Sequence, residues 1–119
     1  MTSKDTFTAE VPKGIIEDEA YISWEEDLDG SVQIKVQAAR DKIESDGVIT
    51  SAKSLGDGLY EKKWNSGLRL YFAVVEKDGR KTLLLLGSGK GRDQQKAIEL
   101  SKKNLNNYKV VKDSIVKRD

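Results

Sequence analysis

The stretch that decides the fold runs from Leu59 to Lys90 and reads LYEKKWNSGLRLYFAVVEKDGRKTLLLLGSGK. Apolar and polar residues alternate along much of it, which is typical of half-buried β-strands, and turn sequences containing glycine interrupt it twice. These features predict an antiparallel meander whose last and most apolar strand lies centrally and is covered on both faces. The expected strands are Leu59–Trp64, Leu68–Glu76 and Thr82–Leu86, separated by hairpin turns at 65–67 and 77–80.

Apolar residues at helical spacing flank the predicted meander on both sides. Upstream, Glu17–Leu28 has this spacing, and Ser31–Asp46 repeats it after a tight turn at 29–30. Residues 47–58 are expected to form a loop. Downstream, a last helix begins near Asp93. The expected fold class is therefore α+β, with two antiparallel N-terminal helices packed on one face of a small, mainly antiparallel sheet, followed by a C-terminal helix.

A chain of 119 residues with a single proline, Pro12, and no linker-like stretch is expected to form one domain over residues 1–119. Residues 1–14 are polar with scattered apolar positions, so we expect them to form an N-terminal arm or a short edge strand. The C-terminal tail at 109–119 contains apolar residues that would allow a further helix or strand.

Two residue types are missing from the chain, and their absence removes several kinds of chemistry. Without cysteine there is no disulfide, thiolate metal site or cysteine nucleophile, and without histidine the commonest general base and zinc ligand are missing. We expect no metal and no small-molecule cofactor. The apolar run Leu83–Leu86 is far too short to span a bilayer, and no N-terminal segment resembles a signal peptide. We therefore expect a soluble, cytoplasmic protein without a membrane partner.

The near-neutral overall charge conceals a strong asymmetry along the chain. The sequence has 21 basic and 20 acidic residues, but residues 1–58 carry a net charge of −7 and residues 59–119 carry +8. A basic half of this kind favours binding to a polyanion through one basic face of a dipolar molecule. The alternative is that both halves are ordinary solvated surfaces.

The glycine-rich segment Gly87–Lys90 is a candidate phosphate-binding loop. Glycines allow backbone N–H groups to approach an anion, and Lys90 and Arg92 add positive charge next to a helix N-terminus. The spacing does not match a Walker A motif, because Gly91 follows the lysine where serine or threonine is required. The alternative is a strand-to-helix turn without a ligand.

Strand alternation gathers cations on the first predicted hairpin. Lys63, Arg69 and Tyr71 fall on one face, which would give a cationic platform with an aromatic edge suited to RNA. Lys62 falls on the opposite face with Tyr60. An ordinary solvated sheet face of mixed polarity is the alternative explanation.

Four motifs, taken in order, give the chain a resemblance to a known family. They are SLGDGLYE at 54–61, GLRLYF at 67–72, LLLGSGK at 84–90, and Gln94 with Ile98 at the start of the last helix. Over about residues 15–108 the chain resembles the addiction-module killer proteins, the HigB-like branch of the RelE/ParE toxin superfamily. The resemblance implies a RelE/ParE-like fold and a toxin of a type II toxin–antitoxin pair, with a helix-turn-helix antitoxin as its partner.

Such toxins typically cut mRNA at the ribosome through attack of the ribose 2′-OH on the adjacent phosphate, so the resemblance implies a metal-independent endoribonuclease. That chemistry needs a base for the hydroxyl, cations for the phosphorane charge and an acid for the leaving 5′-oxygen. By position, Arg69 and Lys90 would stabilise the transition-state charge, and Lys63 would bind the phosphate or act as the base. The expected RNA-contacting residues are Lys62, Tyr71 and Arg92.

Two other functions are compatible with the resemblance. A ParE-like protein would inhibit DNA gyrase without catalysis, and a toxin-derived domain without activity would only bind RNA or protein. The tyrosine that RelE uses in its C-terminal helix would fall near Ala97 here, so that catalytic role is vacant. The sequence leaves one enzyme and two binding functions open.

Overall fold

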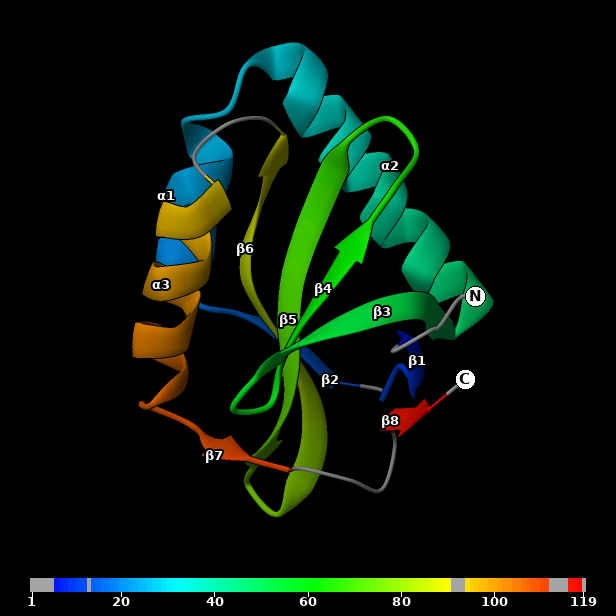
Figure 1. The fold of residues 1–119 in the computed structure, drawn as a ribbon, viewed down its shortest axis with the longest axis vertical. Helices are drawn as coiled ribbons and strands as arrows, with labels where there is room; N and C mark the ends of the chain where they lie inside the picture. The colour runs from blue at the N-terminus through cyan, green and yellow to red at the C-terminus, as the bar shows by residue number, and fades with distance from the viewer. Residues whose placement is uncertain (1–5, 13, 91–93, 112–115, 119) are drawn as a thin grey trace.

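The computed structural model describes residues 6–12, 14–90, 94–111 and 116–118 of the chain. The strands are β1 (Thr6–Glu10), β2 (Gly14–Glu17), β3 (Val48–Gly56), β4 (Leu59–Lys63), β5 (Leu68–Lys77), β6 (Arg80–Lys90), β7 (Lys109–Val110) and β8 (Val116–Arg118). The helices are α1 (Glu19–Glu26), α2 (Gly30–Asp46) and α3 (Gln94–Leu105). All eight strands form one sheet in the order β2-β6-β5-β4-β3-β1-β8, with β7 paired to β5 (Figure 1). The predicted α+β class is confirmed, and the sheet is larger than expected.

The strands β4, β5 and β6 form the predicted antiparallel meander at the centre of the sheet. The loop at 65–67 ends in Gly67, whose φ of 92° is the left-handed conformation that a three-residue hairpin loop requires. Between β5 and β6, Asp78 and Gly79 both have positive φ, as in a type I′ turn. Both turns lie where the sequence predicted them.

Residues 48–56 form β3 instead of the expected loop. The buried positions Ile49 and Ala52 are three residues apart, because Ser51 between them has a φ of 56° and interrupts the pairing with β1. This bulge hides the alternation by which a strand is recognised in a sequence. β1 itself is paired on both sides, with β3 and with β8, so Thr6–Glu10 forms an interior strand of the sheet, while residues 1–5 of the expected N-terminal arm lie outside the described residues.

The helices lie on both faces of the sheet, and the prediction that they share one face is wrong. α2 packs on one face, α3 packs on the other, and α1 lies against β6 beside α3 (Figure 1). The start of the first helix differs as well, because Glu17, a residue expected in that helix, belongs to β2, which pairs in parallel with β6. α1 therefore begins only at Glu19, where Oδ2 of Asp18 caps it by accepting a hydrogen bond from the Ala20 amide at 3.0 Å.

Alternate side chains of the central strands divide between two apolar cores. The core on the α2 side contains Tyr21, Ile43, Leu70, Phe72, Leu83 and Leu85. The core on the α3 side contains Leu59, Tyr71, Ala73, Val75, Leu84, Leu86 and Leu105. The strands β5 and β6 are thus covered on both faces, which explains their nearly continuous apolar sequence.

Candidate nucleic-acid interface

The sheet face that carries α3 presents a row of cations. α3 packs against β6, β5 and β4, and beyond it the side chains of Lys53 and Lys63 are exposed. Cross-strand pairing sets Lys53 opposite Glu61, and Lys63 opposite Arg69, so all four residues belong to the same face. We call Lys53, Lys63 and Arg69 the basic face.

A buried carboxylate holds Arg69 in place. The Nε atom of Arg69 lies 3.4 Å from Oε2 of Glu61, and the two side chains are 19% and 8% exposed. The contact is an ion pair without hydrogen-bond geometry, since Nε has no hydrogen-bond partner among the described residues. The planar guanidinium carries further N–H groups, which are of the kind that bind an oxyanion.

Glu61 is fixed in turn by two other residues. Gln94, the first residue of α3, donates a hydrogen bond from Nε2 to Oε2 of Glu61 at 3.2 Å. Tyr71 lies directly opposite Glu61 in the sheet, and burial, together with the charge and hydrogen bonding of that carboxylate, raises the pKa of the Tyr71 hydroxyl. A charge removed from water needs partners of this kind. Through Glu61, the start of α3 is tied to the cation on β5.

Two of the predicted RNA-contacting residues are not exposed on the basic face. Lys62 lies on the opposite side, where its Nζ donates to the carbonyl oxygen of Thr50 at 2.6 Å and lies 5.7 Å from the Trp64 ring centre. Tyr71 is only 1% exposed, and its ring stacks on Trp24 with the ring centres 6.3 Å apart. Tyr71 shares the sheet face of Lys63 and Arg69, as the alternation predicts, but its ring is buried against Trp24, and its contact with RNA stays a prediction.

The segment predicted as a phosphate-binding loop, Gly87–Lys90, is a strand over its whole length. β6 continues through Gly87 to Lys90, whose backbone pairs with Leu68. Packing explains the glycine at 87, because a Cβ atom there would lie 2.6 Å from Cζ3 of Trp24. The side chain of Lys90 and the whole of Arg92 lie outside the described residues, so their expected roles stay predictions.

Three residues near the basic face were not selected from the sequence. Lys53 was missed because its strand was expected to be a loop. Glu61 follows the same alternation as Lys63, but its contact with Arg69 depends on the register between two strands, which no local pattern encodes. Gln94 was recognised only as part of a family motif, without a role.

The composition of the basic face suits phosphodiester binding. The planar guanidinium of Arg69 matches the spacing of two phosphate oxygens, while the lysine amines contribute mobile point charges. No group of acidic residues within the described ranges could hold a metal ion. No helix among the same residues is long and apolar enough to cross a membrane.

Comparison with known proteins gives a structural match at low sequence identity. No protein-family model matches the chain, and no curated protein matches it. The crystal structure of the isolated E. coli RelE toxin superposes with a TM-score of 0.52 at 20% identity, covering 76% of this chain and 96% of that one. At this identity the match shows a RelE-like fold. The HigB-like branch stays a prediction.

Proposed function

We propose that the chain is the toxin of a type II toxin–antitoxin system and that it acts on RNA through the basic face. The supporting observation is a RelE-like fold in which the guanidinium of Arg69 is held by Glu61 beside Lys63. RNA offers a line of phosphates to this row of cations. In the cell, the protein would act in the cytoplasm on mRNA at the ribosome, and a helix-turn-helix antitoxin would be its partner.

The reaction that we propose is metal-independent cleavage of mRNA. The ribose 2′-oxygen attacks the adjacent phosphorus and gives its proton to a base, and the bond to the 5′-oxygen breaks as that oxygen takes up a proton. The products are a 2′,3′-cyclic phosphate end and a 5′-hydroxyl end. Arg69 and Lys90 would stabilise the phosphorane charge, and Lys63 would bind the phosphate or act as the base.

The Arg69–Glu61 ion pair also favours a second candidate, a domain that binds RNA or protein without cutting. Glu61 offsets part of the Arg69 charge that a phosphorane would need. Tyr71, the aromatic residue beside this pair, is buried and holds its proton firmly because its pKa is raised. A binding domain would retain the basic face and show no turnover.

Expression of the wild-type chain and of Arg69→Ala in bacteria separates these candidates. The expected result is growth arrest with mRNA cleavage, mapped by primer extension, that Arg69→Ala abolishes. Arrest with an SOS response and intact mRNA would instead identify a gyrase inhibitor, and absence of arrest would favour the binding domain. Lys35→Ala, which removes an exposed cation from α2, is the matched control and should arrest growth like the wild type.

A further inference from the structure

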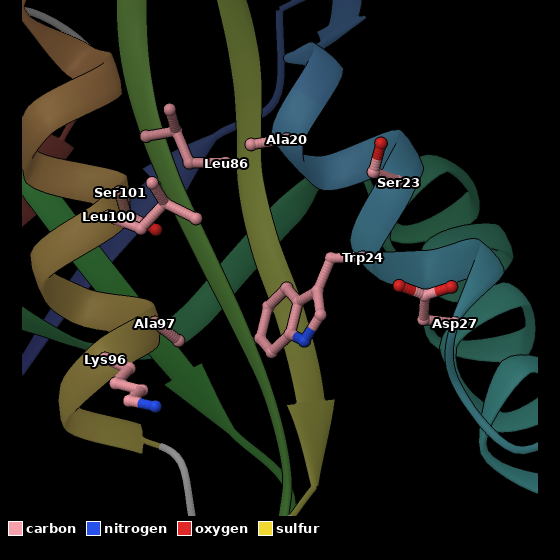
Figure 2. A pocket seen from close by; sticks show the side chains of 9 residues that line it. All are labelled: Ala20, Ser23, Trp24, Asp27, Leu86, Lys96, Ala97, Leu100 and Ser101. Atoms are coloured by element: carbon pink, nitrogen blue, oxygen red, sulfur yellow. The ribbon is translucent and has the colours of Figure 1, made fainter.

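A groove lies between α1 and α3 with β6 as its floor, and it shares no residue with the basic face (Figure 2). Its volume is about 400 Å³, which is within the range of pockets that bind ligands. The side chains of Trp24 and Leu86 lie between the two helices, and Leu100 projects from α3 with 48% of its surface exposed. The groove thus offers apolar surface to a partner.

The groove is maintained by the way Trp24 is held. The indole packs over Gly87, where even a Cβ atom would be too close, and it stacks on the buried ring of Tyr71. In this position the ring lies between the two helices and leaves Leu100 exposed. The small side chains of Ala97 and Ser101 on α3 leave the space above it open.

The two walls of the groove carry opposite charges. On the α1 side, the C-cap residue Asp27 lines the groove, and Glu19 lies in the first turn of the helix, outside the lining. On α3, Lys96 lines the groove, and Lys103 lies two turns further along. No ion pair joins α1 to α3 among the residues that the structure describes. The groove is thus flanked by charges of opposite sign, with Asp27 on one side and Lys96 on the other.

We propose that this groove binds an amphipathic helix of a partner protein. The apolar stripe of that helix would face Trp24 and Leu100, basic residues would line the flank next to α1, and acidic residues would line the flank next to α3. The eight residues of α1 span about 12 Å, so the contact covers about two helical turns. Turning the partner helix end for end exchanges its flanks, so the wall charges fix the direction in which it runs.

The test uses three synthetic helical peptides of about 15 residues, long enough to form a helix. They share one leucine stripe and differ in their flanks, which are basic and acidic, both acidic, or both basic. Each is titrated into the full chain by calorimetry and by tryptophan emission, to which Trp24 in the groove contributes alongside Trp64. The mixed peptide should bind about three- to tenfold more tightly at low salt, because each uniform peptide meets one wall of like charge.

Two variants connect the binding to the groove. Leu100→Lys should weaken all three peptides about tenfold by removing exposed apolar contact area, whereas Ile34→Lys, at a 72% exposed position on α2, should leave them unchanged. The double substitution Lys96→Glu and Lys103→Glu makes both walls acidic, so the uniformly basic peptide should become the tightest ligand. A general loss of folding cannot produce this change of rank.

Three results would overturn the proposal. Equal affinity of the three peptides would show that the charges on the walls do not select the partner. If the mixed peptide does not bind at concentrations up to about 1 mM, the groove is not a docking site for a helix. If the free chain forms a dimer that Leu100→Lys converts to monomers in sedimentation, the occupant is a second copy of the chain. Each readout is independent of RNA cleavage.

Discussion

Arg69 meets its counter-charge inside the sheet, and this contact sets the properties of the basic face. The contact between the Glu61 carboxylate and Nε of Arg69 orients the guanidinium. Gln94 and Tyr71 stabilise the carboxylate, and the cost of burying the charge is thereby shared among four side chains. Because the guanidinium is already oriented by Glu61, a phosphate that binds Arg69 does not have to order it.

Glu61→Gln should lower the free energy of unfolding by about 1–3 kcal/mol, because it leaves a largely buried guanidinium without its carboxylate. Urea unfolding followed by circular dichroism measures the change. In the same background, Arg69→Met should recover part of the loss, since it removes the charge that has no partner. Strictly additive effects of the two substitutions would show that the pair contributes no interaction energy.

The hydrogen bond of Tyr108 is expected to make the free energy of unfolding depend on pH in the alkaline range. Its hydroxyl donates to Oδ1 of Asp18 at 2.7 Å, and burial, this hydrogen bond and the Asp18 charge raise its pKa from 10.0 to about 12. The unfolded chain therefore loses this proton at lower pH than the folded chain does. The stabilisation is complete below pH 10 and disappears as the pH rises towards about 12.

Tyr108→Phe should be less stable than the wild type by about 1 kcal/mol near neutral pH, the value of one hydrogen bond. The two proteins should converge in stability as the pH approaches 12, the region of the raised Tyr108 pKa. Urea unfolding at a series of pH values tests this expectation. Parallel profiles across the alkaline range would mean that Tyr108 does not titrate with the fold.

At the scale of elements, local sequence patterns predicted the meander and failed wherever a long-range contact decides the structure. The turns at 65–67 and 77–80 contain the glycines that their conformations require, so they were recognisable. β3 was not, because the positive φ of Ser51 breaks its alternation. β2 is a four-residue strand whose identity depends on its pairing with β6, about 70 residues away in the sequence.

In the candidate site, too, local patterns predicted some features, while others depend on long-range contacts. That Lys63 and Arg69 share a face follows from alternation across one hairpin, and the structure places them opposite each other. The contacts of Glu61 with Gln94 and Arg69 join three elements, so they become visible only when the register and the position of α3 are known. Burial of Tyr71 depends on Trp24 of α1, which alternation within the sheet cannot reveal.

The contact between α1 and β6 makes a prediction at the scale of elements. Gly87→Ala should lower the free energy of unfolding by about 1–3 kcal/mol, because its Cβ atom would overlap the Trp24 ring at 2.6 Å. Gly30→Ala is the matched control, since nothing lies within 4 Å of a Cβ atom at the start of α2. It should be neutral or slightly stabilising. Equal effects of the two substitutions in thermal unfolding would contradict the close packing of Trp24 on β6.

At the scale of the whole molecule, the charge asymmetry along the chain does not translate into two separate faces. The acidic half contributes β1, β2 and β3 to the sheet together with α1 and α2. Lys53, which belongs to that half, lies beside the cations of the basic half because β3 pairs with β4. The basic face is therefore a product of the fold, and the net charge of each half of the sequence describes it only in part.

The most direct test of this account is the binding of a short unstructured RNA, measured by fluorescence anisotropy between about 50 and about 200 mM salt. The wild-type affinity should fall steeply with salt, and the double substitution Lys53→Glu and Lys63→Glu should weaken binding about tenfold or more at low salt and flatten the salt dependence. Lys35→Glu, which reverses an exposed charge on α2, should follow the wild type. Equal affinities of the three proteins, or wild-type binding that salt does not change, would contradict the assignment of the basic face to RNA.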